Sequence, residues 1–260
     1  MEDFKMNFEI KRQLNTLELS DLAEVIEKNE NNLKLLDMSY DERLELMLEE
    51  LITTRRNRLI SRLIKNAELK YPNATLESLD YETRELKAET INAIASMGFM
   101  NQATNIIITG PSGAGKTYLA SMLGVEACKQ TYRTHYIRMS DMLMHIKNHK
   151  DNLREQVRFR KRLGNYKLLI IDEWLSYKVD EKELKFIYEL IEHRCGINST
   201  IFVSQYGVKE WHERLCGGTL ADSIMDRIIH NSYLIPTNEV NLRKLYDSKK
   251  VEMIFENKNY

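Results

Sequence analysis

Hydrophobic positions follow two different patterns along the chain. Up to about residue 70, leucines and isoleucines recur every three or four residues, and no glycine or proline precedes Pro72, which predicts helices. From about residue 83, short apolar runs alternate with helical patterns. Strands that alternate with helices are typical of a parallel sheet covered by helices on both faces. We therefore predict an α/β fold with strands at residues 105–109, 134–138, 167–171, 200–204 and 233–235.

The helical part contains a clear helix start. Ser39 is followed three residues later by Glu42, which is the spacing of a capping box. An apolar face follows, and its later part lies opposite an arginine-rich face. This apolar face comprises Leu44, Met47, Leu48, Leu51, Ile52, Leu59, Leu63 and Ile64. We predict a helical domain for partner contacts or oligomerisation over residues 1–72, a linker with the first core helix over 73–104, and the α/β core over 105–260.

Composition and charge add less than their distribution does. The chain has 260 residues with 43% hydrophobic content, enough for a sizeable core, and its formal net charge of −1 gives no hint of nucleic acid. Residues 1–50 carry 14 acids against 6 bases, whereas residues 51–70 carry 6 bases and one acid. Such blocks often mark interaction surfaces, although solvated helix faces show them too.

The cysteines and the apolar runs predict a location. The three cysteines are far apart and form neither a disulfide framework nor a zinc spacing, which fits a reducing cytoplasm. No signal peptide starts the chain, and no apolar run approaches the roughly 20 residues that cross a bilayer. We expect a cytoplasmic protein without membrane contact.

A phosphate-binding loop follows the first predicted strand. The stretch GPSGAGKT has the pattern G-x-x-x-x-G-K-[ST] and precedes a helical segment, which is the context that this motif requires. Its glycines let backbone N–H groups surround phosphates at a helix N-terminus. Lys116 would reach the β- and γ-phosphates, and Thr117 would bind Mg²⁺ through its hydroxyl. The predicted ATP-binding residues are Gly110, Pro111, Ser112, Gly113, Ala114, Gly115, Lys116, Thr117 and Tyr118.

The third predicted strand ends in two carboxylates. Asp172 can hold Mg²⁺ through water beside the phosphate loop, and Glu173 is placed to polarise a water for attack on the γ-phosphate. A kinase acting on a small molecule has no need of such a glutamate, so ATP hydrolysis is favoured. The next strand ends in Ser204, followed by Gln205. A polar side chain there, for which Ser204 is the candidate, could detect the γ-phosphate, or it could be an ordinary polar strand end.

The phosphate loop, the IIDE strand and the VSQ strand, in this order, resemble the AAA+ class of P-loop ATPases. Longer stretches resemble the IstB-like helper ATPases of bacterial insertion sequences, which are relatives of the DnaC helicase loaders. The resemblance covers roughly residues 40–245 and is most specific in RRNRLISRLIKNAELKYPNATLESLDYE and LADSIMDRIIHNSYLI. It implies an AAA+ core with a five-stranded parallel sheet, flanked by helices, and a reduced or absent C-terminal lid after Pro236.

The resemblance also implies a function. It is that of an ATP-dependent regulator of transposition that assembles on double-stranded DNA and recruits or stimulates its cognate transposase. Arg227 is similar to an arginine finger that completes the ATP site of a neighbouring subunit, so the homo-oligomer would share its ATP sites. Spacing alone instead favours a surface arginine on an amphipathic helix. Arg243 resembles a late basic position near the nucleotide.

Two basic segments are candidates for DNA contact. In the families named above, the region before the third strand faces a nucleic-acid channel, where cations would bind backbone phosphates. For this region, a solvated basic helix is the alternative. The second segment lies earlier in the chain, and it would contact either DNA or the acidic first 50 residues of a neighbouring subunit. The candidate cations are Lys147, Arg154, Arg158, Arg160, Lys161 and Arg162 in the first region, and Arg55 and Arg56 in the second.

Three other functions remain open at this point. A DnaC-like replicative helicase loader would have the same core and a different client. A non-hydrolysing, ATP-switched DNA-binding adaptor is disfavoured by Glu173. A metabolite kinase is the least favoured, because nothing resembles a pocket for an acceptor substrate.

Overall fold

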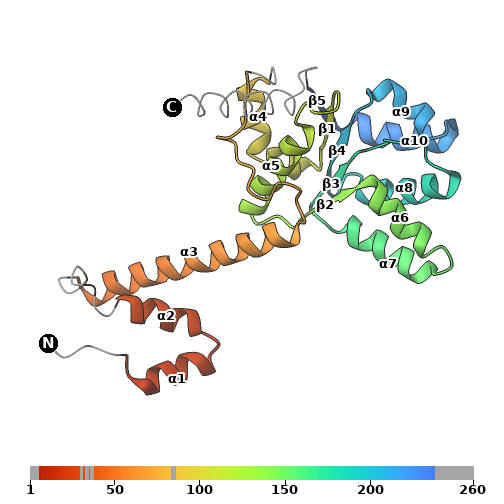
Figure 1. Cartoon of the computed structure of the whole chain (residues 1–260). Helices are drawn as coiled ribbons and strands as arrows, with labels where there is room; N and C mark the ends of the chain where they lie inside the picture. The colour runs from red at the N-terminus through yellow and green to blue at the C-terminus, as the bar shows by residue number, and fades with distance from the viewer. Residues whose placement is uncertain (1–5, 30–31, 33–34, 36–37, 83–85, 238–260) are drawn as a thin grey trace, which may run out of the picture. The chain divides into compact units, whose positions relative to one another are not determined.

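The computed structural model of the chain describes residues 6–29, 32, 35, 38–82 and 86–237 (Figure 1). The chain forms two compact units, Met1–Arg62 and Leu63–Tyr260. The segment boundaries at residues 72 and 104 stay predictions. Arg243 and the chain on which the expected lid depends lie outside the described residues. None of the described helices is both long enough and apolar enough to traverse a lipid bilayer.

The first unit consists of helices. The long helix begins at the predicted capping box, where Ser39 N donates to the Glu42 carboxylate (2.7 Å) and Glu42 N donates to Ser39 Oγ (3.3 Å). Its predicted apolar face is only partly covered: Leu51 is buried, but Ile52 is 64% exposed. The helices are α1 (Phe8–Thr16), α2 (Ser20–Asn29) and α3 (Tyr40–Asn66), the last of which runs on into the second unit.

The second unit is built on a parallel sheet. All five strands run in the same direction, in the spatial order β2-β3-β4-β1-β5. This confirms the predicted α/β class, and each strand lies within one residue of its predicted position. The strands are β1 (Asn105–Thr109), β2 (Thr134–Arg138), β3 (Leu168–Asp172), β4 (Ser199–Ser204) and β5 (Ser232–Pro236).

Helices cover both faces of the sheet, because successive residues of a buried strand point to opposite sides. Ile106 and Ile108 belong to the core under α4 and α5, whereas Ile107 belongs to the core under α6 to α10 (Figure 1). Trp174 and Trp211 are buried in the second of these cores. The helices are α4 (Ala88–Ala95), the 3₁₀ helix η2 (Gly98–Gln102), α5 (Lys116–Lys129), α6 (Met139–Asn148), α7 (Leu153–Gly164), α8 (Glu181–Arg194), α9 (Val208–Arg214) and α10 (Gly218–Ile229).

The strand order decides where chemistry can occur. Strands β3, β4 and β1 are neighbours, so Asp172, Ser204 and Thr109 end at the same edge of the sheet. Ligands of open α/β sheets bind at the carboxyl ends of the strands. Strand β2 lies at the margin of the sheet, and its Tyr136 N donates to the carbonyl oxygen of Ala67, one residue beyond α3 (2.8 Å).

Candidate functional site: a nucleotide pocket

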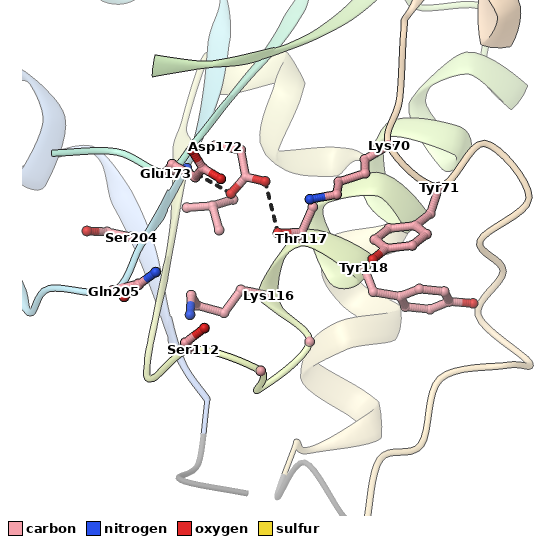
Figure 2. Close-up of a pocket in the computed structure, with 13 residues that line it drawn as sticks. Lys70, Tyr71, Ser112, Lys116, Thr117, Tyr118, Asp172, Glu173, Ser204 and Gln205 are labelled. Carbon is pink, nitrogen blue, oxygen red and sulfur yellow. Dashed lines mark hydrogen bonds between the residues drawn. The ribbon is translucent and has the colours of Figure 1, made fainter. Parts of the chain in front are cut away.

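A cavity of about 370 Å³ opens at the carboxyl edge of the sheet (Figure 2). Four segments form it: the β1–α5 loop with the start of α5, the end of β3, the end of β4, and the chain that follows α3. We call it the nucleotide pocket. It is lined by Lys70, Tyr71, Ser112, Gly113, Gly115, Lys116, Thr117, Tyr118, Asp172, Glu173, Val203, Ser204 and Gln205.

The loop from residue 110 to 117 depends on glycine at two kinds of position. Gly113 and Gly115 have φ values of 89° and 78°, which favour glycine, and Gly115 caps α5. At Gly110 the reason is steric as well, because a Cβ there would lie 2.1 Å from Thr237 Oγ1. Within the loop, Ala114 is buried and Pro111 is exposed, and neither is among the residues that line the nucleotide pocket. The free amides at the start of α5 make this end of the pocket suited to an anion.

Lys116 is already folded over the loop. Its Nζ donates to the carbonyl oxygens of Gly110 and Pro111, each at 2.6 Å, and the residue is only 8% exposed. Neutral carbonyl oxygens are weaker partners for an ammonium group than phosphate oxygens are. A phosphate that binds to the loop can therefore replace these carbonyl oxygens as the hydrogen-bond acceptor of Lys116 Nζ.

Asp172 is 3% exposed and is held by three donors. Thr117 Oγ1 (2.9 Å) and the hydroxyl of Tyr136 (2.8 Å) both donate to its Oδ2, and Glu173 N donates to its Oδ1 (2.8 Å). Burial, and then the nearby Asp172 charge, raise the pKa of Tyr136, so this phenol stays a donor. These bonds fix the orientation of a buried carboxylate.

The residues at this point fit Mg²⁺. Thr117 Oγ1 and the Asp172 carboxylate are hard oxygen ligands side by side at the mouth of the phosphate loop. Magnesium at nucleotide sites is usually held by one or two protein oxygens together with phosphates and water. In the described part of the chain, no three or more His, Cys, Asp or Glu side chains come together in a group that could hold a metal ion.

Glu173 has a strained backbone. Its φ of 56° lies in the left-handed region, which costs a residue other than glycine about 1–3 kcal/mol. Neighbouring backbone bonds hold the turn, since Trp174 N donates to Val203 O (2.7 Å) and Ser176 N donates to Glu173 O (3.0 Å). Strain of this kind is typical of functional sites, and the side chain lies beside Asp172 in the nucleotide pocket (Figure 2).

At the end of β4, the two polar residues lie differently. Ser204 is buried, and its Oγ donates to Trp174 O (2.8 Å) and accepts from Tyr206 N (3.1 Å). Gln205 is exposed, and its side chain extends toward Lys116 (Figure 2). The side chain at this strand end that is available to a ligand is therefore Gln205, whereas the sequence prediction placed the role on Ser204.

Sequence reasoning missed the far wall of the pocket. Lys70 and Tyr71, from the chain after α3, lie opposite Ser204 and Gln205 (Figure 2). The ring of Tyr71 lies 5.6 Å from that of Tyr118, whose hydroxyl also bonds Ser78. Both residues lie in one of the stretches that resemble the IstB-like family, but no pattern in that stretch indicates a pocket wall, because the wall forms only when residues far apart along the chain come together.

Arg227 lies away from the nucleotide pocket of its own chain. Its Nε lies 2.6 Å from a carboxylate oxygen of Glu192 on α8, and its guanidinium lies 5.4 Å from the Tyr188 ring. It also borders a small hollow with Asn105 and Thr200, at the amino ends of β1 and β4. The structure therefore places Arg227 toward the opposite edge of the sheet from Asp172.

The predicted cations of α6 and α7 divide into two groups. Three form ion pairs: Lys147 with Glu183 (2.8 Å), Arg158 with Glu155 (3.0 Å), and Arg160 with Glu189. The other three are exposed and form no ion pair within the described part of the chain. These exposed cations are Arg154, Lys161 and Arg162.

A buried arginine anchors α7. Arg194 is 1% exposed, and its Nη1 donates to the carbonyl oxygens of Leu163 and Tyr166, each at 2.8 Å. Its Nε also donates to Thr200 Oγ1 (2.9 Å). Desolvation lowers the pKa of Arg194 to about 9, so it is charged at neutral pH. This charge faces the carbonyl end of α7 and fixes the basic helix to the sheet.

In the first unit, the earlier basic run contacts acids of its own chain. Arg55 donates to both carboxylate oxygens of Asp21 (2.5 and 2.8 Å), and this lowers the pKa of Asp21 to about 2. Arg58 pairs with Glu24 (2.7 Å), whereas Arg56 is exposed. Of the two predicted DNA contacts here, Arg56 alone has its charge unpaired among the described residues.

Comparison with known proteins agrees with this architecture. Residues 12–250 match the family of IstB-like ATP-binding proteins. The chain is 28% identical over 239 residues to an insertion-sequence ATP-binding protein of Sinorhizobium fredii (strain NBRC 101917 / NGR234), covering 92% of this chain and 96% of the relative. It is 35% identical over 195 residues to the ATP-binding protein of insertion sequence IS1162 from Pseudomonas fluorescens, covering 74% and 84%.

Solved structures share the fold of a large part of the chain. The DnaC helicase loader superimposes with a TM-score of 0.56 at 20% identity, over 65% of this chain and 99% of that one. The replication initiator DnaA, bound to AMPPCP and single-stranded DNA, gives 0.55 at 22% identity, over 67% and 52%. Both likenesses confirm the predicted fold. With a family match across most of its length, the chain belongs to the IstB-like ATP-binding proteins.

Proposed function

We propose that the chain is a Mg²⁺-dependent ATPase that regulates DNA transposition. One observation carries the hydrolytic part: Lys116, Thr117, Asp172 and Glu173 line one pocket at the carboxyl edge of the sheet. The regulatory part rests on the relatives, which are ATP-binding proteins of insertion sequences.

ATP would bind with its phosphates on the loop amides and the N-terminus of α5. Lys116 would leave the carbonyl oxygens of Gly110 and Pro111 and donate to the β- and γ-phosphates, where its hydrogen bonds are charge-assisted. Thr117 and Asp172 would hold Mg²⁺, which neutralises charge on these phosphates when bound.

Glu173 would act as the general base. Its carboxylate accepts a proton from a water molecule, whose oxygen attacks the γ-phosphorus as the bond to the β-phosphate oxygen breaks, giving ADP and phosphate. Gln205 extends toward Lys116 and would hydrogen-bond a γ-phosphate oxygen or the attacking water. Ser204 would act through its buried bond to Trp174 O, by fixing the strand end from which Gln205 projects.

Arg227 would complete the ATP site of a neighbouring subunit. It is bound to Glu192 and is absent from the lining of its own nucleotide pocket. As an arginine finger, Arg227 would therefore act on the ATP site of a second copy of the chain. A homo-oligomer with shared ATP sites is part of this mechanism.

Double-stranded DNA would be bound through its backbone phosphates. Arg154, Lys161 and Arg162 are exposed and unpaired within the described chain, so they are the primary contacts. Lys147, Arg158 and Arg160 would contribute after exchange of their carboxylate partners, and Arg55 and Arg56 would add contacts from the first unit. Such binding is independent of sequence and sensitive to salt. The assembled protein would then recruit or stimulate its cognate transposase.

The first test uses Glu173→Gln, which should bind ATP and hydrolyse it slowly. The size of the particle on a long duplex is measured with and without ATP. We expect a large DNA-bound oligomer only with ATP, and its loss in the Glu173→Gln/Arg227→Ala double variant. A monomer that ignores duplex DNA in both conditions overturns the proposal, and binding to single strands and to a replicative helicase would then support the loader function.

The cations are tested by the salt dependence of duplex binding. Arg154→Gln and Lys161→Gln should each make the slope of log affinity against log salt shallower by about 1. Lys209→Gln, which removes an exposed charge from α9, is the matched control and should leave the slope unchanged. If Arg154→Gln and Lys161→Gln keep the wild-type slope, as the control does, α7 is not the DNA-binding surface.

A further inference from the structure

Tyr136 links two parts of the molecule that the ATPase motifs do not connect. Its hydroxyl donates to Asp172 Oδ2 (2.8 Å), and its backbone N donates to the carbonyl oxygen of Ala67 (2.8 Å). The residue lies in the middle of β2, in register with Ile170 of β3, and is buried. One residue thus contacts both the predicted magnesium ligand and the chain just after α3.

The hydroxyl completes the set of donors around the carboxylate. Asp172 Oδ2 accepts from Thr117 and from Tyr136, and Oδ1 accepts from the N–H of Glu173. A carboxylate has about four acceptor positions, so the contacts among the described residues leave one, on Oδ1. Without the Tyr136 bond, Oδ2 would keep only the Thr117 hydroxyl, whose own oxygen must also face the metal.

We infer that Tyr136 is a positioning residue for magnesium: it fixes the plane of the Asp172 carboxylate beside Thr117, at the mouth of the phosphate loop. The inference rests on the proposed ATPase function and adds a residue outside the sequence motifs. A phenol suits this task, because it donates one hydrogen bond without adding a charge that would compete with the cation.

The position of Tyr136 is itself set from the other side. Ala67 and Leu69 are buried, and Leu69 packs so closely on α5 that a Cβ on Gly124 would lie 2.6 Å from its Cδ2. The next residues, Lys70 and Tyr71, line the nucleotide pocket. The segment after α3 therefore holds the backbone of Tyr136 and forms the pocket wall at the same time.

The test separates metal binding from nucleotide binding. ATP affinity of Tyr136→Phe is measured by equilibrium binding, first without a divalent cation and then across a Mg²⁺ titration. We expect the ATP affinity without metal to stay unchanged. The Mg²⁺ concentration at which half of the Mg²⁺-dependent increase in ATP affinity is reached should rise by about tenfold. Tyr132→Phe removes a hydroxyl from the same core, four residues earlier, and should match the wild type.

A double-variant cycle shows whether the effect runs through Asp172. In an Asp172→Asn background the carboxylate is gone, so adding Tyr136→Phe should cause no further change in the Mg²⁺ dependence. Additive effects overturn the inference. So does a loss of metal-free affinity as large as the loss with Mg²⁺, because that result reports a disturbed pocket.

The failure of the proposed function has a different signature. If wild-type protein binds no ATP, or binds it equally with and without Mg²⁺, the ATPase proposal is wrong. If wild-type affinity rises with Mg²⁺ and Tyr136→Phe follows the same titration curve, the ATPase proposal stands and the role of Tyr136 is wrong.

Discussion

Arg227 and Glu192 form an ion pair at 2.6 Å, so the side chain proposed to act on a neighbouring subunit is bound to its own α8. The pair is partly exposed, with 26% of the Arg227 side chain and 51% of the Glu192 side chain accessible. Exposed pairs contribute only about 0–1 kcal/mol, so a phosphate can displace this glutamate. The pair therefore orients the arginine, which also donates to Ser223 O (2.9 Å), without locking it.

Arg227→Ala should abolish hydrolysis while ATP binding persists. Loss of an arginine finger lowers the rate by about a thousandfold or more. The decisive measurement mixes two inactive variants, Arg227→Ala and Glu173→Gln, because one supplies the base and the other supplies the arginine. Activity should return on mixing if the site is shared. If no activity returns while mixed oligomers form, Arg227 does not act in trans.

Lys116→Met should weaken ATP binding by roughly 10- to 100-fold, since hydrogen bonds to charged groups contribute about 1.5–3 kcal/mol. The measurement is the affinity for ATP, with Lys129→Met as control. Lys129 lies at the other end of α5, where it pairs with Glu126. Equal affinity in the two variants would show that Lys116 stays on the loop carbonyl oxygens when ATP binds.

Gly110→Ala should disrupt the phosphate loop, whereas Gly207→Ala should be tolerated. At Gly110 the new methyl group would collide with Thr237, and the φ of 144° disfavours any other residue. Backbone strain of this kind costs about 1–3 kcal/mol. At Gly207 the nearest atom, Glu210 Oε2, lies 3.6 Å away. Melting temperature and ATP affinity should fall together in Gly110→Ala only. If both stay at their wild-type values in Gly110→Ala, the close approach of Thr237 to Gly110 is wrong.

The free energy of unfolding should fall as the pH drops below about 6.5. Burial, with a smaller contribution from Arg162, lowers the pKa of His135 below its ordinary value, against the opposing effect of Glu68. In that pH range the unfolded chain binds more protons than the folded one, so acid favours unfolding.

Urea unfolding at pH 7.5 and pH 5.8 measures this difference. His135→Phe preserves an aromatic ring beside Tyr166 and should make the difference smaller. Part of the difference should remain, because burial also lowers the pKa of His145, with further lowering by His149 and Arg162. An unchanged difference in His135→Phe would show that this histidine does not carry the effect.

Local patterns were enough to predict the sheet and the phosphate loop. Each strand is a short apolar run between helical segments, so β1 and β3 could be located from neighbouring residues alone. The loop has a fixed glycine spacing because only backbone amides close to one another along the chain can surround a phosphate. Asp172 follows from its place at a strand end.

What the sequence could not reveal depends on contacts between distant segments. Nothing around Tyr136 indicates that its hydroxyl reaches Asp172, because that contact requires β2 and β3 to pair. The choice between Ser204 and Gln205 depends on which side chain the turn after β4 buries. The partner of Arg227 depends on how α10 packs on α8.

The place of β1 between β4 and β5 has a consequence for protein synthesis. Ile106 pairs with Ile201 on one side and with Tyr233 on the other, so both neighbours of β1 are made about a hundred residues later. When the phosphate loop GPSGAGKT leaves the ribosome, the strands that flank β1 have therefore not yet been synthesised, and the nucleotide pocket cannot form. Until β4 emerges, β1 is an unpaired apolar strand, and until β5 emerges one of its two edges stays open, which makes it a target for chaperones and for aggregation.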